Sequence, residues 1–414
     1  MLLEAQAGFR AKMGTTDHIF ALHGLITHFI NQNKQLFCTF VDFTKAFDYI
    51  VRENLWFKIY RLGIRGRLFN VIKSMYSHVY TRVKLQNDIG TIFESHLGLR
   101  QGECLSPILF SLYINDLEDT LYLKGAKGVD TGLLKIFLLM YADDIVIFAN
   151  SADELQYNLD ILGEYCKQWK LKVNINKTKV LIFRKGGRVP RNLEFLYDDA
   201  AIEIVNQFTY LGIVFTTGGS FMQATKTLAG QAQKAIYKLR KYLNKFVNIT
   251  PDHKIELFDK LIKPILLYGS EVWGSIKRIH IERIHTQFIK YILSVKTSTQ
   301  NDFILAETGR LDLQTLSTIN MIKYWFKVIC SPEHKYINLI YKLMLDDIEI
   351  RPLKHNWASQ VKRVLSSLGF YHVWLAQGVG NYPSFLLVFK QRLTYNSVQN
   401  LNYAQEFKLI FVFY

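Results

Sequence analysis

Residues 140–148 read MYADDIVIF and place two adjacent carboxylates, Asp143 and Asp144, inside the most apolar run of the chain. Apolar residues on both sides favour two buried strands, 135–141 and 145–149, with a tight turn at 142–144 between them. A solvated turn is the simplest interpretation, because Asp is a common turn residue. In a partly dry place, however, adjacent carboxylates repel each other, and a divalent cation would remove that cost. The turn can therefore serve as a metal site if a third carboxylate reaches it.

Asp42 is the candidate for the third carboxylate, because it ends a second apolar run, LFCTFV at residues 36–41. If that strand lies next to the hairpin in one sheet, Asp42 comes to lie beside Asp143. Three carboxylates at strand ends can hold two metal ions about 4 Å apart, and such a pair activates the attacking oxygen and stabilises the leaving oxygen in phosphoryl transfer. Mg²⁺ is the expected ion, because it binds a few carboxylates together with substrate phosphate oxygens and water.

The composition and charge of the chain indicate a globular protein that binds a polyanion. The 414 residues are 49% hydrophobic and 21% charged, with a net charge of +16, which suits two or three domains with sizeable cores. Residues 226–296 contain 14 Lys and Arg against 5 Asp and Glu, interleaved with aromatic residues. Such a segment is typical of nucleic-acid binding, although a basic protein without such a partner is the alternative.

Several classes of protein are not supported by the sequence. The four cysteines lie far apart and form neither a disulfide framework nor a zinc knuckle. Residues 133–149 are too short and too charged for a membrane span, and no signal-peptide pattern opens the chain. We therefore expect an intracellular protein, in the nucleus or cytoplasm, with no membrane partner.

The pattern of apolar residues predicts an α+β fold with helices on one face of an antiparallel sheet. A helix is expected from about Thr16, alternating strands and helices in 36–220, and mostly helices from 221 onward. Within the middle part we expect a helix from 45 to 60, a hairpin at 82–93 and strands at 171–183 and 208–215. Ser106 and Ser151 are expected to begin helices, the latter with a capping box.

The helix expected at 222–246 has two distinct faces. Its apolar face contains Leu228, Ala232, Ala235, Leu239, Tyr242 and Phe246, and its basic face contains Lys234, Lys238, Lys241 and Lys245.

Three motifs in a fixed order resemble the palm of reverse transcriptases, specifically those of non-LTR (LINE-like) retrotransposons. They are FVDFTKAFD at 40–48, GLRQGECLSP at 98–107 and YADD at 141–144. Other segments are also similar to that family: QAGFR at 6–10 with TTD at 15–17, LKVN at 171–174 with KTK at 177–179, YLG at 210–212 and LLYGSEVW at 266–273. The resemblance covers roughly residues 4–310, and it implies a right-hand polymerase palm followed by a helical thumb.

The resemblance implies a catalytic role for four side chains. Asp42, Asp143 and Asp144 would bind two Mg²⁺ ions, with Mn²⁺ as a possible substitute, and the backbone carbonyl of Phe43 would complete one metal shell. Lys177 would protonate the pyrophosphate leaving group. Lys179 is the competing choice for this lysine, and either side chain could simply be solvated.

Other matched positions would form the nucleotide pocket and support the primer. Phe47 would exclude a ribose 2′-OH and so select dNTPs, although packing in the core is the alternative. Arg100, Gln101 and Gly102 would shape the pocket, with Arg100 as a solvated loop residue in the alternative. Tyr210, Leu211 and Gly212 would support the primer terminus. Asp48 is expected to be structural.

The resemblance also implies an organisation and a function. We expect a partial fingers segment at 1–35, the palm at 36–220, a basic helical thumb at 221–310 and a region of unknown role at 311–414. Family members carry fingers segments and an endonuclease that do not occur in this sequence, so a fragment of a larger protein is expected. It would be an RNA-directed DNA polymerase acting on an RNA template, a DNA primer and dNTPs.

Three alternatives remain at this stage. The chain could be an inactive retroelement remnant that binds nucleic acid. An RNA-dependent RNA polymerase shares the carboxylates, but Phe47 argues against it. A group II intron maturase also carries the YADD turn, whereas residues 268–273 point to the non-LTR branch.

Overall fold

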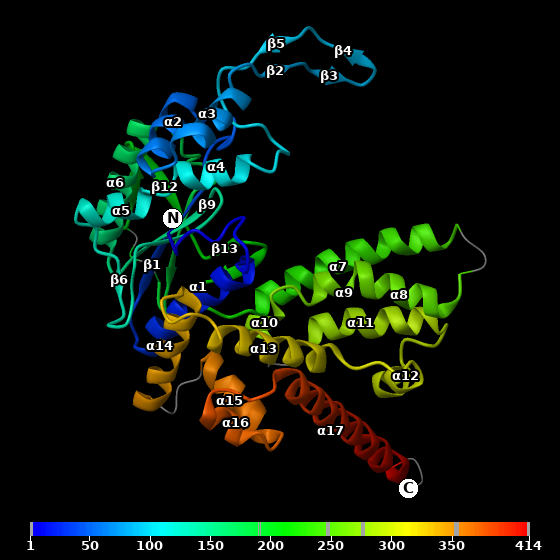
Figure 1. Ribbon diagram of the computed structural model, residues 1–414. Helices are drawn as coiled ribbons and strands as arrows, with labels where there is room; N and C mark the ends of the chain where they lie inside the picture. Colours follow the sequence, from blue (N-terminus) through cyan, green and yellow to red (C-terminus); the bar gives the residue numbers. More distant parts are fainter. Residues whose placement is uncertain are drawn as a thin grey trace. The chain divides into compact units, whose positions relative to one another are not determined.

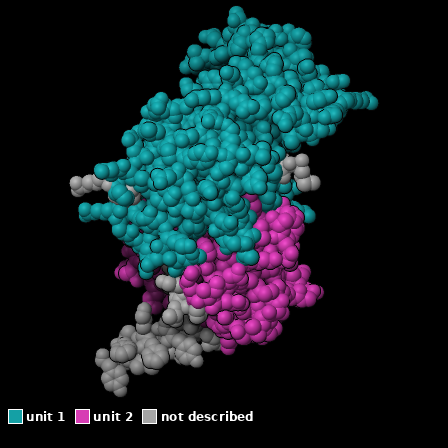
Figure 2. All heavy atoms as spheres, turned by 90° about the vertical axis from the view of Figure 1, so that its left-hand side faces the viewer, with its two compact units in different colours: residues 1–18, 29–211 teal, residues 19–28, 212–414 magenta. Residues whose placement is uncertain are grey.

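The computed structural model describes residues 3–411 except 189, 191, 246–248, 275–277 and 352–355, with side chains up to residue 396. The chain forms two compact units, which Figure 2 shows in different colours. Unit 1 contains Met1–His18 and Phe29–Leu211, and unit 2 contains Ile19–His28 and Gly212–Tyr414. The division into fingers, palm, thumb and C-terminal region stays a prediction.

Unit 1 is built on a six-stranded sheet with the order β11-β12-β10-β1-β9-β8. Figure 1 labels β1, β9 and β12 of this sheet. All neighbouring strands are antiparallel except β10 and β12, which are parallel because the chain runs out along β11 before it returns along β12. The α+β class is thus confirmed, with one parallel pair that the sequence did not predict. The strands are β1 (Leu36–Val41), β8 (Leu138–Tyr141), β9 (Asp144–Ala149), β10 (Lys179–Phe183), β11 (Phe195–Tyr197) and β12 (Ala200–Val205).

The core of unit 1 lies around β1, which is buried at every position. Helix α6 (Ala152–Trp169) contacts β1, β9 and β11, and it begins where predicted, since Ser151 Oγ accepts a hydrogen bond from Glu154 N. Phe40 of β1 packs against two rings of β13 (Gln207–Tyr210), and its ring centroid lies 4.4 Å from that of Phe208. Burial on both sides explains why β1 is apolar along its whole length.

The other elements of unit 1 correct some predicted boundaries. The helix expected from residue 45 begins at Arg52, because 44–49 form turns, and the strand expected at 135–141 is split by Phe137. Ser106 begins a helix without capping it; its Oγ donates instead to Arg100 O. The elements are α2 (Arg52–Arg61), α3 (Gly66–Met75), β2 (Tyr80–Thr81), β3 (Lys84–Leu85), β4 (Asp88–Ile89), β5 (Phe93–Glu94), α4 (Ser106–Tyr113), α5 (Leu117–Leu123), β6 (Val129–Asp130) and β7 (Lys135–Ile136).

Unit 2 is mostly helical, as predicted. Helix α7 (Met222–Leu243) buries Leu228, Ala232 and Leu239 and exposes three lysines of the predicted basic face, at 234, 238 and 241; Lys245, also exposed, lies in the turn after the helix. Tyr242 is exposed rather than buried, because Leu243 takes the core position; Phe246 lies outside the described residues. The other elements are β14 (Ile213–Thr216), α8 (Pro251–Leu261), α9 (Lys263–Leu266), α10 (Ser270–Trp273), α11 (Ile279–Ile292), α12 (Asn301–Glu307), α13 (Leu313–Ile329), α14 (Tyr336–Ile350), α15 (Trp357–Ser367), α16 (Tyr371–Ala376) and α17 (Tyr382–Phe411).

Helix α1 (Thr15–Asn31) begins where predicted and contributes its middle to unit 2. None of the helices in the described part of the chain combines the length and the hydropathy needed to cross a membrane.

Candidate active site

The register of the sheet brings the three predicted carboxylates to one edge. β1 and β9 are antiparallel with Val41 opposite Ile145, so the next position of the ladder places Asp42 across from Asp144. The β8–β9 hairpin closes with Tyr141 opposite Asp144. Only Ala142 and Asp143 form the turn, which is one residue tighter than the sequence predicted, because Asp144 already belongs to β9.

The three carboxylates repel one another at this edge. Burial raises the pKa of Asp144 to about 6, and the charges of Asp143 and Asp42 add to that shift. The pKa of Asp143 is also raised, first by burial and then by Asp42, while the nearby Lys177 lowers it. Burial and mutual repulsion make the ionised carboxylates unfavourable here, and a bound cation would offset that free-energy cost.

The backbone of Asp42 is held on both sides by the loop that precedes β10. Its N–H donates to Thr178 Oγ1 at 3.2 Å, and its carbonyl accepts from Asn174 N at 2.8 Å. Its Oδ2 is buried and accepts no hydrogen bond from the described residues. This buried oxygen is suited to a metal ion or a positive side chain. The sequence did not predict the role of Thr178, because nothing in its pattern indicates a contact with residue 42.

Lys177 lies at the carboxylates, whereas the competing Lys179 does not. Lys177 lies in the turn that precedes β10, and its Nζ lies 3.6 Å from Asp42 Oδ2. Lys179 Nζ instead pairs with Glu203 at 2.8 Å. The geometry thus separates two lysines that the sequence could not distinguish.

No group of three or more His, Cys, Asp or Glu side chains stands ready to hold a metal ion among the described residues. The three carboxylates nevertheless fit a cation through their shared edge, their mutual repulsion and the unbonded Asp42 Oδ2. Phe43 follows Asp42 in the chain. Its side chain is buried, and its backbone forms an isolated antiparallel β-bridge with Val173.

The predicted nucleotide-pocket residues come together where two loops of unit 1 pair. Leu99 N donates to Phe47 O at 2.8 Å, and Gln101 Nε2 donates to Asp48 Oδ1 at 2.8 Å. Asp48 is therefore a structural acceptor for a predicted pocket side chain. The ring of Phe47 stacks on Phe110 with centroids 4.8 Å apart, yet it remains partly exposed.

Two other predicted pocket residues have distinct settings. Arg100 Nη2 donates to Met75 O, and its guanidinium lies 5.4 Å from the centre of the Tyr76 ring. Arg100 is thus an anchored side chain rather than a freely solvated one. Gly102 has a φ of +87°, and a Cβ there would meet nothing within 4 Å. Backbone conformation, rather than crowding, requires glycine at this position.

The predicted primer-supporting residues have the backbone of a tight turn. Leu211 and Gly212 both have positive φ, at 46° and 79°. Tyr210 is buried, and its Oη lies 3.4 Å from Nδ1 of the buried His18. Burial raises the pKa of Tyr210 well above its usual range, and the charge of Asp144 adds to this. His18 had no predicted role, because a lone histidine on an apolar helix carries no signal.

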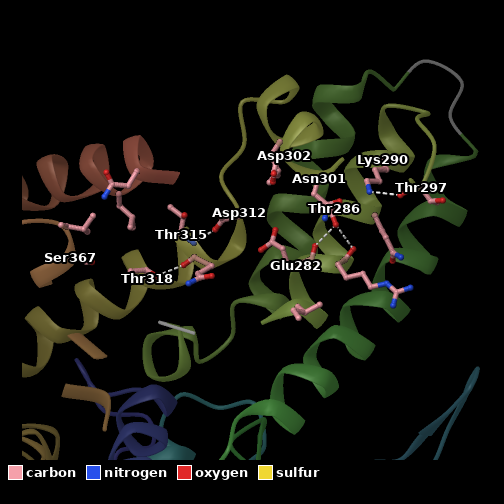
Figure 3. A pocket seen from close by; sticks show the side chains of 18 residues that line it. Glu282, Thr286, Lys290, Thr297, Asn301, Asp302, Asp312, Thr315, Thr318 and Ser367 are labelled. Carbon is pink, nitrogen blue, oxygen red and sulfur yellow. Dashed lines mark hydrogen bonds between the residues drawn. The ribbon is translucent and has the colours of Figure 1, made fainter. Parts of the chain in front are cut away.

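A large cavity in unit 2 has different chemistry (Figure 3). It has a volume of about 1110 Å³ and lies among α11, α12 and α13. Several of its polar side chains already bond to nearby backbone: Asp312 Oδ1 accepts from Thr315 N, and Lys290 Nζ donates to Thr297 O. These groups stabilise the helices, so the candidate catalytic chemistry lies at the sheet edge of unit 1.

Residues 2–215 match the family model described as reverse transcriptase (RNA-dependent DNA polymerase). The chain belongs to the reverse transcriptase family. All of the predicted site residues lie within the matched range, and the α+β fold of unit 1 agrees with it.

The sequence of this reverse transcriptase chain is similar to those of polymerases from several retrotransposable elements. It is 26% identical over 292 residues to the probable RNA-directed DNA polymerase from transposon BS of Drosophila melanogaster, covering 69% of this chain and 31% of the relative. It is 23% identical to the RNA-directed DNA polymerase from mobile element jockey of Drosophila funebris, covering 70% and 31%. A Pol polyprotein of element R2 from Popillia japonica is 26% identical, covering 64% and 37%. The chain thus spans about a third of the length of these relatives.

Among solved structures, the reverse transcriptase chain is similar to telomerase from Candida albicans in complex with a fragment of telomeric RNA. The TM-score is 0.38 at 14% identity, covering 83% of this chain and 52% of that one.

Proposed function

We propose that this chain is an RNA-directed DNA polymerase of a retrotransposon, which adds dNTPs to the 3′-OH of a DNA primer along an RNA template. The observation that carries the proposal is the shared edge of β1 and β9, where Asp42, Asp143 and Asp144 lie with Lys177. In a member of the reverse transcriptase family, this cluster supplies the groups that nucleotidyl transfer needs.

Two Mg²⁺ ions, or Mn²⁺ in their place, would be held by Asp42, Asp143 and Asp144, with the carbonyl of Phe43 as a further ligand. When bound, such ions supply positive charge that lowers the pKa of the primer 3′-OH and stabilises the leaving oxygen. The buried Asp42 Oδ2, which accepts no hydrogen bond from the described residues, and the raised pKa values of the Asp pair support this assignment.

In the proposed step, the primer 3′-oxygen forms a bond to the α-phosphorus of the dNTP as the bond to the pyrophosphate oxygen breaks. The 3′-hydroxyl proton passes to solvent water, and Lys177 donates a proton to the pyrophosphate. Lys177 is suited to this role because its Nζ lies at the carboxylates, 3.6 Å from Asp42, while its side chain remains 68% exposed and can reach substrate.

Other residues would bind and select the substrates. Phe47 would exclude the ribose 2′-OH, while Arg100, Gln101 and Gly102 would line the nucleotide pocket. The pairing of Gln101 with Asp48 supports this, because it fixes the loop next to Phe47. The turn at 210–212 would support the primer terminus.

The nucleic acid would be bound through its backbone by the basic helices of a thumb at 221–310. The exposed lysines of α7 support this proposal, because contacts to phosphates give affinity without reading sequence. We further propose residues 1–35 as a partial fingers segment and 36–220 as the palm, with no role assigned to 311–414. The protein would act in the nucleus or cytoplasm, without a membrane partner.

Primer extension on poly(rA)/oligo(dT) with Mg²⁺ tests the proposal. The chain is expected to incorporate dTTP, and Asp143→Asn is expected to abolish incorporation while leaving binding of the template–primer unchanged. Equal incorporation by both proteins would overturn the metal assignment. If neither protein extends the primer but both bind RNA with strong salt dependence, the chain is an inactive remnant that binds nucleic acid.

A further inference from the structure

Residues 5–7 lie alongside β8, directly beside the turn that carries the Asp pair. Met140 N donates to Ala5 O at 2.7 Å, and Ala7 N donates to Met140 O at 2.9 Å. Gln6 is thereby bridged in parallel to Met140. This short pairing brings the side chain of Gln6 within reach of the peptide groups of the turn.

Both polar atoms of the Gln6 carboxamide bond to one residue of the turn. Oε1 accepts from Ala142 N at 3.0 Å, and Nε2 donates to Ala142 O at 3.4 Å. Oε1 also accepts from Gly8 N at 2.9 Å. The side chain is fully buried, so water does not compete for these bonds.

Ala142 adopts a conformation that alanine rarely takes. Its φ is +57°, in the left-handed region that favours glycine. The bonds from Gln6 satisfy the N–H and the C=O of Ala142 in that conformation, and they would be lost if the residue relaxed to negative φ. A relaxed Ala142 would redirect the peptide that leads to Asp143.

Two neighbours of Gln6 hold it against the turn. Gly8 must lack a side chain, because a Cβ there would lie 2.3 Å from Ala142 N. Arg10 Nη1 donates to Leu3 O at 2.6 Å and to Gln6 O at 2.8 Å, which fixes the backbone of the segment. The QAGFR segment thus acts as one unit on the turn.

We infer that Gln6 is a positioning residue for catalysis, because it holds Ala142 in the left-handed conformation that aims Asp143 and Asp144 at the shared edge. Its consequence for DNA synthesis rests on the function proposed above. Loss of a purely structural glutamine would affect stability alone. Loss of a positioning residue affects the geometry of the carboxylates, and a substitution that relieves the backbone strain at residue 142 then compensates for it.

The test combines Gln6→Met with Ala142→Gly. Met has nearly the length of Gln but makes no such hydrogen bonds, and glycine adopts positive φ without cost. Gln6→Met is expected to lower kcat at least tenfold with little change in KM for dNTP. Adding Ala142→Gly is expected to recover at least half of that loss on a logarithmic scale. If kcat falls in Gln6→Met, with or without a change in KM, and Ala142→Gly does not recover it, the inference is overturned.

Gln156 provides a matched control. Its carboxamide makes the same reciprocal pair of bonds to one backbone residue, since Oε1 accepts from Leu196 N at 2.8 Å and Nε2 donates to Leu196 O at 3.0 Å. Gln156→Met is expected to leave kcat unchanged. Equal losses in the Gln6 and Gln156 variants would show a general effect of losing such bonds and would contradict the inference.

Mn²⁺ binding, followed by electron paramagnetic resonance, tests the inference apart from polymerase activity. Gln6→Met is expected to weaken Mn²⁺ binding at least fivefold, and Ala142→Gly is expected to restore it. If the wild type shows no polymerase activity, the proposed function fails, but this comparison still decides the role of Gln6. If Gln6→Met does not fold by circular dichroism, Gln6→Leu, which also lacks the hydrogen bonds to Ala142, takes its place. Unchanged Mn²⁺ binding in the folded variant would overturn the inference.

Discussion

At the scale of single residues, the site depends on side chains with two possible roles. Phe47 packs on Phe110, as a core residue would, but keeps part of its ring exposed. Lys177 lies at Asp42, as a catalytic lysine would, but also forms an ordinary ion pair there. Substitutions with matched controls separate the two roles in each case.

Replacing Phe47 with Ala is expected to increase incorporation of rNTPs relative to dNTPs by about a hundredfold, which corresponds to roughly 2.7 kcal/mol in discrimination. The ring would no longer occupy the space of the 2′-OH. The measurement is the ratio of kcat/KM for dTTP and UTP on poly(rA). Phe110→Leu, which removes the stacking partner but leaves the ring at 47, serves as the control. Unchanged discrimination in Phe47→Ala would remove the gate role.

Replacing Lys177 with Met is expected to lower kcat by about a hundredfold, since general acids contribute about 10²- to 10⁴-fold. Lys179→Met breaks only the pair with Glu203 and is expected to change kcat less than threefold. Both are compared by single-turnover incorporation across pH. Similar losses in the two variants would show that Lys177 has no special part in proton transfer.

At the scale of elements, periodicity predicted the parts but not all of their connections. Helices α1, α6 and α7 begin close to where their apolar spacing and caps indicated. The meeting of Asp42 with the hairpin was also predicted, because both follow apolar strands. By contrast, the bonds from Gln101 to Asp48 and from Gln6 to Ala142 join distant segments. Single polar residues carry no periodic pattern, so such bonds could not be predicted.

The pairing of the loop at 98–101 with the turns at 44–50 predicts the effect of Gly98→Ala. A Cβ at Gly98 would lie 2.7 Å from Asp48 O, whereas a Cβ at Gly132 would meet nothing within 4 Å, and the two φ values are +80° and +81°. Gly132→Ala is expected to cost about 1–2 kcal/mol from backbone strain alone. Gly98→Ala is expected to cost about 1–3 kcal/mol more, because the clash adds to the strain.

Urea unfolding of the two variants measures this difference. Equal destabilisation would mean that the loop and the turn are not in close contact. A larger loss in Gly98→Ala, together with weaker dNTP binding, would show that the contact also shapes the nucleotide pocket.

At the scale of the whole molecule, each unit contains a buried histidine that stays neutral. Burial lowers the pKa of His18 in unit 1 to about 3, with the charge of Arg10 contributing. Burial lowers the pKa of His23 in unit 2 to about 4, with Arg278 contributing. The buried His18 Nε2 and His23 Nδ1 have no hydrogen-bond partner among the described residues, so a proton on either nitrogen would find no acceptor there.

These histidines are expected to make the protein sensitive to acid. The unfolded chain binds a proton on each ring near pH 6.5, while the folded chain does not until about pH 3 or 4. Between these values the unfolded state binds more protons, so stability falls as the pH falls. Each histidine is expected to cost about 2 kcal/mol at pH 5, at roughly 1.4 kcal/mol per pH unit.

Urea unfolding at pH 7 and pH 5 checks this expectation through His18→Gln. The variant is expected to lose less stability between the two pH values than the wild type. His78→Gln changes a histidine whose side chain is 72% exposed and is expected to match the wild type. A His18 variant with the same pH dependence as the wild type would contradict the prediction.

Addition of a single nucleotide tests the central claim most directly. The chain is mixed with a DNA primer on an RNA template of defined sequence, one dNTP at a time, with Mg²⁺. We expect the wild type to add only the complementary dNTP. Asp42→Asn, Asp143→Asn and Asp144→Asn are each expected to slow the addition by at least about a hundredfold while binding the template–primer as tightly. Addition that ignores the template base, or equal rates in wild type and Asn variants, would contradict the account.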